Sequence, residues 1–121
     1  MHNIHTNFIK ILDVLKDIIG DEINEKGNYL RRGSVPKFSD IEVIALSLTA
    51  ECLSIDSENY LFSKLNNEYL GNFKNLISRR QYNDRRKLLF EKTEHVRKSM
   101  AERINEQADI FAPRSRPYRA R

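Results

Sequence analysis

The residues best suited to chemistry in this chain lie between positions 79 and 87, where cations surround one aromatic side chain. The segment reads Arg-Arg-Gln-Tyr-Asn-Asp-Arg-Arg-Lys, with five cations and a single acid. Arginine and lysine contact phosphate oxygens, and the free backbone N–H groups at a helix start favour the same ligand. The segment is therefore a candidate polyanion-binding surface. Its candidate contacts are Arg79, Arg80, Asn83, Arg85, Arg86 and Lys87.

The distribution of charge along the chain supports this interpretation but leaves an alternative open. Residues 1–77 carry a net charge of −3, and residues 78–121 carry +7, within a total of +4. A basic third joined to an acidic body is the electrostatic outline of a nucleic-acid binder. The alternative is that Arg85 and Arg86 pair with acids of the first 77 residues. We also expect Arg80 and Asp84 to form an i,i+4 pair.

A second candidate surface precedes this segment. Two helices expected at about 40–53 and 58–66, joined by a short turn, are compatible with a helix-turn-helix whose second helix enters the major groove. Asn59 and Lys64 would then face outward, and these side chain types contact adenine, guanine or phosphate. Against this, the turn contains no Gly, and Glu58 would repel phosphate. An ordinary helical hairpin of a bundle explains the same pattern.

The elements that position these residues are all expected to be helices, so the fold class is all-α, a compact helical bundle. Apolar residues recur at helical spacing from Phe8 to Ile19, with Thr6 or Asn7 as the expected cap and Gly20 as the stop. Residues 21–38 predict an ordered loop. Two capping boxes, Ser39 with Glu42 and Ser78 with Gln81, mark later helix starts.

We expect three parts along the chain. Residues 1–77 form the bundle, with the candidate helix-turn-helix at about 40–66, and residues 78–111 form one long basic, amphipathic helix. A thin apolar stripe on that helix predicts that its distal half projects or packs on a partner. Residues 112–121 contain four Arg and no acid and are expected to be disordered. The stripe consists of Tyr82, Leu89, Val96, Met100, Ile104 and Phe111.

Several functional classes lack support in the sequence. No apolar run is long enough for a membrane span, and no secretory signal is visible, so we expect a cytosolic protein. The lone Cys52 lies in an apolar pattern and is expected to be a small core residue. No phosphate loop, metal-ligand spacing or nucleophile motif occurs, so we expect no catalytic residues, no metal site and no cofactor.

Three runs of residues resemble a known family. They are Lys37-Phe-Ser-Asp-Ile-Glu-Val-Ile-Ala-Leu-Ser-Leu-Thr-Ala-Glu-Cys-Leu, then Ser57-Glu-Asn-Tyr-Leu-Phe, then Leu76-Ile-Ser-Arg-Arg-Gln-Tyr-Asn-Asp-Arg-Arg-Lys-Leu-Leu. In residue identity and order they are similar to the N-terminal region of bacterial DDE-type insertion-sequence transposases, closest to the nine-eight-two insertion-sequence family. The resemblance covers about residues 1–112.

The resemblance implies that this helical region binds double-stranded DNA at the terminal inverted repeats of the element. The family's catalytic RNase H-like domain, which holds two divalent metals such as Mg²⁺, follows this region. Its first catalytic Asp has no match here, because the chain departs from the pattern at Pro113, and Asp109 precedes the expected position. The resemblance therefore implies a truncated transposase that binds DNA without cutting it, in the bacterial cytoplasm and nucleoid.

Other partners and other functions are also open. The long helix could pair with a second copy of the chain or with a full-length transposase. A different class of function is a helical interaction protein whose basic helix docks on an acidic protein. A third is a pseudogene product with no selected function. The sequence does not decide between these hypotheses.

Overall fold

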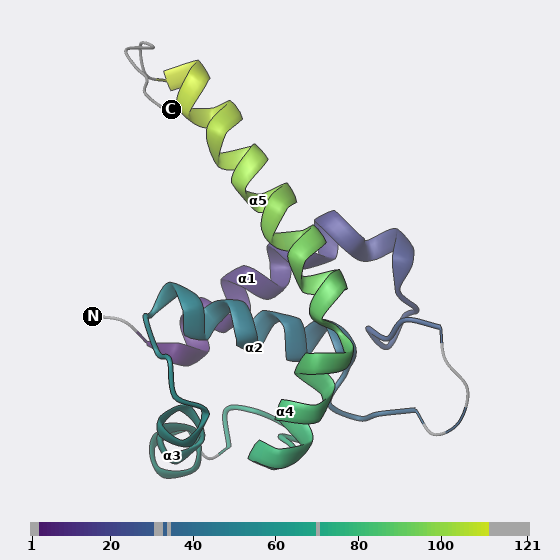
Figure 1. The fold of residues 1–121 in the computed structure, drawn as a ribbon, viewed down its shortest axis with the longest axis vertical. Coiled ribbons are helices and arrows are strands. Elements are labelled where there is room, and N and C mark those ends of the chain that lie inside the picture. The colour runs from purple at the N-terminus through teal and green to yellow at the C-terminus, as the bar shows by residue number, and fades with distance from the viewer. Residues whose placement is uncertain (1–2, 31–32, 34, 70, 112–121) are drawn as a thin grey trace.

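The computed structural model describes residues 3–30, 33, 35–69 and 71–111, with side chains described as far as Arg103. Within these ranges the chain is helical and contains no strand, which confirms the all-α expectation. Figure 1 shows α1 and α2 lying against each other at the centre, α3 seen nearly end-on, and α4 leading into α5. The helices are α1 (Ile4–Ile19), α2 (Asp40–Cys52), α3 (Glu58–Glu68), α4 (Arg79–Leu88) and α5 (Phe90–Phe111), with a short 3-10 turn, η1 (Gly20–Glu22), after α1.

Helix α1 begins earlier than the sequence pattern predicts. Its cap is Asn3, whose side chain accepts a hydrogen bond from the backbone N–H of Thr6 at 3.0 Å, so the expected cap at Thr6 or Asn7 is wrong. The extra turn buries Ile4, whose N–H donates to the hydroxyl of Tyr69 at 3.1 Å. An apolar residue placed before the regular stripe therefore joins the core.

The loop between α1 and α2 is ordered by side chain to backbone hydrogen bonds in the residues described. The Asn24 carboxamide oxygen accepts from the N–H of Lys26 at 2.9 Å and of Asn28 at 3.0 Å. The buried Asn28 in turn accepts from the N–H of Asp40 at 2.9 Å. The bond between Asn28 and Asp40 is buried and satisfies polar groups that water does not reach. The loop therefore packs on the start of α2.

Helix α2 occupies the centre of the molecule, as its nearly all-apolar circumference predicts. Its capping box forms, with the N–H of Ser39 donating to Glu42 at 2.8 Å. The helix ends in a Schellman arrangement, in which Ile55 N–H donates to the carbonyl of Ala50 and Ser54 N–H to that of Glu51. Ser54 takes the left-handed conformation there, with φ of 59°.

Cys52 does not lie in the core. It is exposed at the last turn of α2, because the helix end turns that position toward solvent. The expectation of a buried thiol was wrong, and the reason is local. The apolar periodicity that surrounds Cys52 includes almost every face of α2, so the pattern could not assign a side to this one residue.

The run expected as one helix from Arg79 is divided at Leu89, which has φ of −97° and ψ of 11°. The Thr93 hydroxyl donates to the carbonyl of Leu89 at 3.0 Å, beside the backbone bond from Thr93 N–H to the same oxygen. Such back-bonding by Ser or Thr bends helices. Figure 1 shows α5 running away from the other helices toward the C-terminus.

The first residues of the apolar stripe expected on this run face the core. Tyr82, Leu89 and Val96 are buried, and Met100 packs against the core. Ile104 and Phe111 lie outside the described side chains, and the basic tail at 112–121 lies outside the described residues. Among the described helices, none combines the length and the apolar character that a bilayer crossing requires.

Candidate nucleic-acid interface

Helix α4 is fixed to the body by one buried aromatic. Tyr82 packs its ring against Phe62 of α3, with the ring centroids 5.1 Å apart. The Ser78–Gln81 capping box forms at the start of the helix, with Gln81 N–H donating to the Ser78 hydroxyl at 3.1 Å. These contacts fix the rotation of α4 and thereby decide where each of its cations points.

Arg85 points inward. Its Nη2 lies 2.8 Å from Oδ1 of Asp40, and a second guanidinium nitrogen donates to the carbonyl of Phe38. The Arg85 side chain is 14% exposed and that of Asp40 is fully buried. Arg85 therefore pairs with an acid of the first 77 residues, which is the alternative interpretation of the sequence. Arg85 joins helices and is not available to a phosphate in this conformation.

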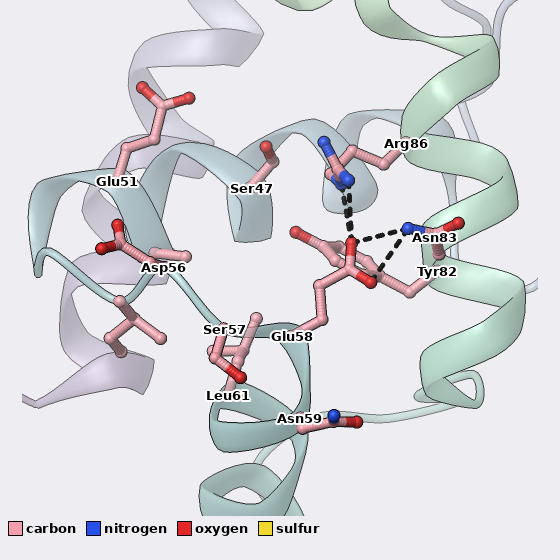
Figure 2. Close-up of a pocket in the computed structure, with 12 residues that line it drawn as sticks. Ser47, Glu51, Asp56, Ser57, Glu58, Asn59, Leu61, Tyr82, Asn83 and Arg86 are labelled. Atoms are coloured by element: carbon pink, nitrogen blue, oxygen red, sulfur yellow. Dashed lines mark hydrogen bonds and ion pairs between the residues drawn. The ribbon is translucent and has the colours of Figure 1, made fainter.

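Three further candidate contacts meet at a single carboxylate, that of Glu58 at the start of α3, and Figure 2 shows two of them, Asn83 and Arg86. Arg86 Nε and Nη2 both lie 2.9 Å from Glu58 Oε2. Asn83 Nδ2 donates to both carboxylate oxygens, at 2.9 and 3.0 Å. Arg79 Nη1 lies 3.7 Å from Oε1. Arg86 therefore also pairs with an acid of the first 77 residues, and Glu58 faces α4 at the edge of the bundle.

The remaining two cations of the segment are exposed. Arg80 and Lys87 are seven residues apart, which places them on one face of α4 about 10 Å apart along its axis. The expected pair of Arg80 with Asp84 does not form, and no ion pair joins Arg80 or Lys87 to another residue of the described chain. Their charges are free to meet an anion.

Helix α3 presents a polar outer face. Asn59 is exposed, whereas Lys64 is half-buried and pairs with Glu68 at 3.2 Å. The hydrogen bond with Glu68 raises the pKa of Lys64, so the lysine stays protonated, and the Glu68 carboxylate partly compensates its charge. Residues 63, 66 and 67 complete the face with further small polar side chains. These are the exposed Ser63, Asn66 and Asn67.

A pocket of about 490 Å³ lies between α2, α3 and α4. Figure 2 shows Asn83 and Arg86 of α4 pointing toward Glu58, with Glu51 and Asp56 farther away on the other side of the pocket. Burial raises the pKa of Tyr82, which lines the pocket, to about 12, despite a hydrogen bond with Ser47 that lowers it. The other ionisable lining residues are Glu51, Asp56, Glu58 and Arg86. Within the described residues, no three His, Cys, Asp or Glu side chains are placed to hold a metal ion.

Sequence reasoning missed two features of this surface. Ser63 and Asn67 were not singled out, although their spacing from Asn59 at i+4 and i+8 places them on one side of a helix. Glu58 was expected to oppose phosphate, and its role as the shared acceptor of α4 was not foreseen. That role arises only because α3 and α4 approach each other in space, since Glu58 and Asn83 are 25 residues apart in the sequence.

Comparisons of the chain with protein-family models, with curated proteins and with solved structures found no match.

Proposed function

We propose that this chain is a double-stranded-DNA-binding domain in which α3 lies in the major groove and exposed cations of α4 contact phosphate. The observation that carries the proposal is the outer face of α3. It presents Asn59, Ser63 and Asn67 to solvent, with Asn67 Nδ2 donating to Ser63 Oγ at 3.3 Å, and the adjoining helix exposes Arg80 and Lys87. Amides and hydroxyls read base edges, and cations position the protein on the backbone.

The connection between α2 and α3 supports a helix-turn-helix within this proposal. The turn contains no Gly, the residue that most often takes a left-handed conformation at the end of a helix. Ser54 supplies that conformation here, with φ of 59°, and the Schellman bonds close the end of α2. The buried α2 then acts as the support of an exposed α3.

The resemblance to the N-terminal region of insertion-sequence transposases supplies the target within this proposal. On that basis the bound DNA is the terminal inverted repeat of an element. The contacts implied by the resemblance then need revision by geometry. Arg80 and Lys87 remain direct candidates, whereas Arg85 serves the fold and Arg79, Asn83 and Arg86 are held by Glu58.

The test is a salt titration of binding to a labelled random-sequence DNA duplex pool. The double variant Arg80→Ala, Lys87→Ala should reduce the magnitude of the log–log salt slope by about 1.8, because each lost phosphate contact removes about 0.9. The matched control is Lys10→Ala, Lys16→Ala, which removes the same charge from the exposed side of α1. No binding at low salt, or equal slopes for both double variants, would contradict the proposal.

A second candidate function is protein binding, and one observation favours it. Leu88 and Phe90, on either side of the break between α4 and α5, are 79% and 56% exposed. Exposed large apolar side chains are common in interaction surfaces, and these two are the exposed large apolar side chains among those described in α4 and α5. Replacing both with Gln should leave DNA affinity unchanged under the first proposal. Loss of self-association in sedimentation, with DNA affinity intact, would assign these residues to a protein contact.

A further inference from the structure

The Glu58 carboxylate sits in a donor set that is suited to a larger anion than itself. Two guanidinium groups and one amide converge on it, at 2.9 Å from Arg86, 2.9 and 3.0 Å from Asn83, and 3.7 Å from Arg79. Guanidinium forks bind carboxylate and phosphate oxygens with the same geometry. A site that holds a carboxylate in this way therefore also fits a phosphodiester oxygen pair.

Charge at this site is not balanced by Glu58 alone. One negative charge faces two positive charges, and the 3.7 Å separation to Arg79 is too long for a hydrogen bond. Asp56 lines the same pocket, but it forms no ion pair with any residue in the described chain. Arg79 therefore has guanidinium N–H groups that Glu58 leaves unoccupied, and these are the donors that a larger anion would use.

The site is also reachable from solvent. The side chains of Arg79 and Arg86 are 47% and 37% exposed, and that of Glu58 is 20% exposed. Ion pairs at such exposure contribute little to stability, so breaking them costs little. Glu58 is the first residue of α3, where the helix dipole favours a negative charge even without the arginines. The Glu58 carboxylate can therefore leave its partners while the helix dipole and solvent still stabilise its charge.

We infer that Glu58 occupies a phosphodiester-binding site formed by Arg79, Asn83 and Arg86, and that a DNA backbone displaces it. The inference rests on the proposed function and deepens it. In the free protein Glu58 masks two of the arginines, which weakens binding to incidental polyanions. On duplex DNA the phosphate replaces the carboxylate on the same three donors, all of which lie on α4.

The experiment compares Glu58→Gln with Asp56→Asn on the same labelled random-sequence duplex pool. Both variants add one positive charge to the same pocket, but only the first removes the partner of the arginines. Glu58→Gln should bind roughly three- to tenfold more tightly than Asp56→Asn, the range expected when weak ion pairs no longer compete. Its log–log salt slope should equal that of Asp56→Asn, because under this inference the arginines contact phosphate in both complexes.

The outcomes separate this inference from the proposed function. Equal affinity of Glu58→Gln and Asp56→Asn, with wild-type binding intact, overturns the masking role and leaves DNA binding standing. Absence of binding by wild type and by both variants overturns the two together. If Glu58→Gln is too unstable for binding measurements, NMR of the wild-type protein tests the site. The NMR signals of Arg86 Nε–H and Asn83 Nδ2 should shift on adding duplex, and unchanged signals under saturating duplex overturn the site.

Discussion

Arg85 Nη2 lies 2.8 Å from Oδ1 of Asp40, and this pair joins α4 to the first residue of α2. The other oxygen of Asp40 accepts from the N–H of Tyr29 at 3.0 Å, which ties the long loop to the same point. Three segments of the chain therefore depend on one buried carboxylate. The most cationic stretch of the sequence thus contributes one of its charges to the fold.

Replacing Arg85 with Leu should lower the free energy of unfolding by about 3–5 kcal/mol, since it leaves a fully buried carboxylate without its cation. The measurement is urea unfolding followed by circular dichroism. Arg80→Leu is the control, because Arg80 is exposed and should change stability by less than about 0.5 kcal/mol. Equal effects of the two substitutions would show that the buried pair does not stabilise the fold.

The turn at Gly27 gives a second stability prediction. Gly27 has φ of +87°, and a Cβ there would lie 2.8 Å from Ile41 Cγ2 and 2.9 Å from Ser39 Oγ. Gly27→Ala should therefore cost about 2–4 kcal/mol, from backbone strain together with overpacking. Gly71 also has positive φ, +105°, but an added Cβ there meets nothing within 4 Å.

Gly71→Ala is thus the matched control and should cost only about 1 kcal/mol, the strain of a left-handed backbone. Both variants can be compared by thermal unfolding at neutral pH. A cost for Gly71→Ala as large as that for Gly27→Ala would mean that backbone strain alone decides. The close approach of Gly27 to the start of α2 would then be of no consequence.

Local signals in the sequence predicted the helix starts, because a cap is made by residues near one another in the chain. Ser39 with Glu42 and Ser78 with Gln81 both form their reciprocal bonds. The start of α1 was placed too late, since Asn3 lies outside the regular apolar stripe. The bend at Leu89 was not foreseen, because neither Gly nor Pro marks it.

The candidate site was predicted by residue type but not by arrangement. The basic segment was identified, and so was the possibility that its arginines pair with acids of the body. Which arginine pairs with which acid depends on partners far away in sequence, 45 residues for Arg85 and Asp40 and 28 for Arg86 and Glu58. Helix periodicity carries no information about such distant contacts.

Alkaline pH should destabilise the protein through Tyr82. Its pKa is about 12 in the folded chain, because burial disfavours the phenolate, against 10.0 when unfolded. Between about pH 10 and 12 the unfolded state therefore binds fewer protons than the folded state, and the free energy of unfolding falls as pH rises. The stabilisation is complete below pH 10 and is lost as pH rises through the folded pKa.

Tyr82→Phe removes the ionising group while keeping most of the buried ring. Wild type should lose about 2 kcal/mol more than this variant between pH 9 and 12, since one pKa unit corresponds to about 1.4 kcal/mol. Urea unfolding at a series of pH values measures the difference. Parallel curves for the two proteins would show that Tyr82 is not protected from ionising in the folded state.

The outer face of α3 should determine sequence preference without setting overall affinity. Selection of preferred duplexes from a random pool by wild type, followed by competition between the selected and a scrambled duplex, measures that preference. Asn59→Ala should reduce the discrimination by about 1–3 kcal/mol at one base pair, because an amide that reads a base edge is lost. Its salt slope should stay unchanged, since Asn59 carries no charge.

Asn72→Ala is the control, because Asn72 is exposed outside the helices, in the link between α3 and α4. It should leave both discrimination and salt slope as in wild type. Arg80→Ala should instead weaken binding to selected and scrambled duplexes by the same factor, as loss of a phosphate contact does. If Asn59→Ala behaves like Arg80→Ala, or if Asn72→Ala relaxes the preference as strongly, α3 does not read the bases and the groove contact lies on another element.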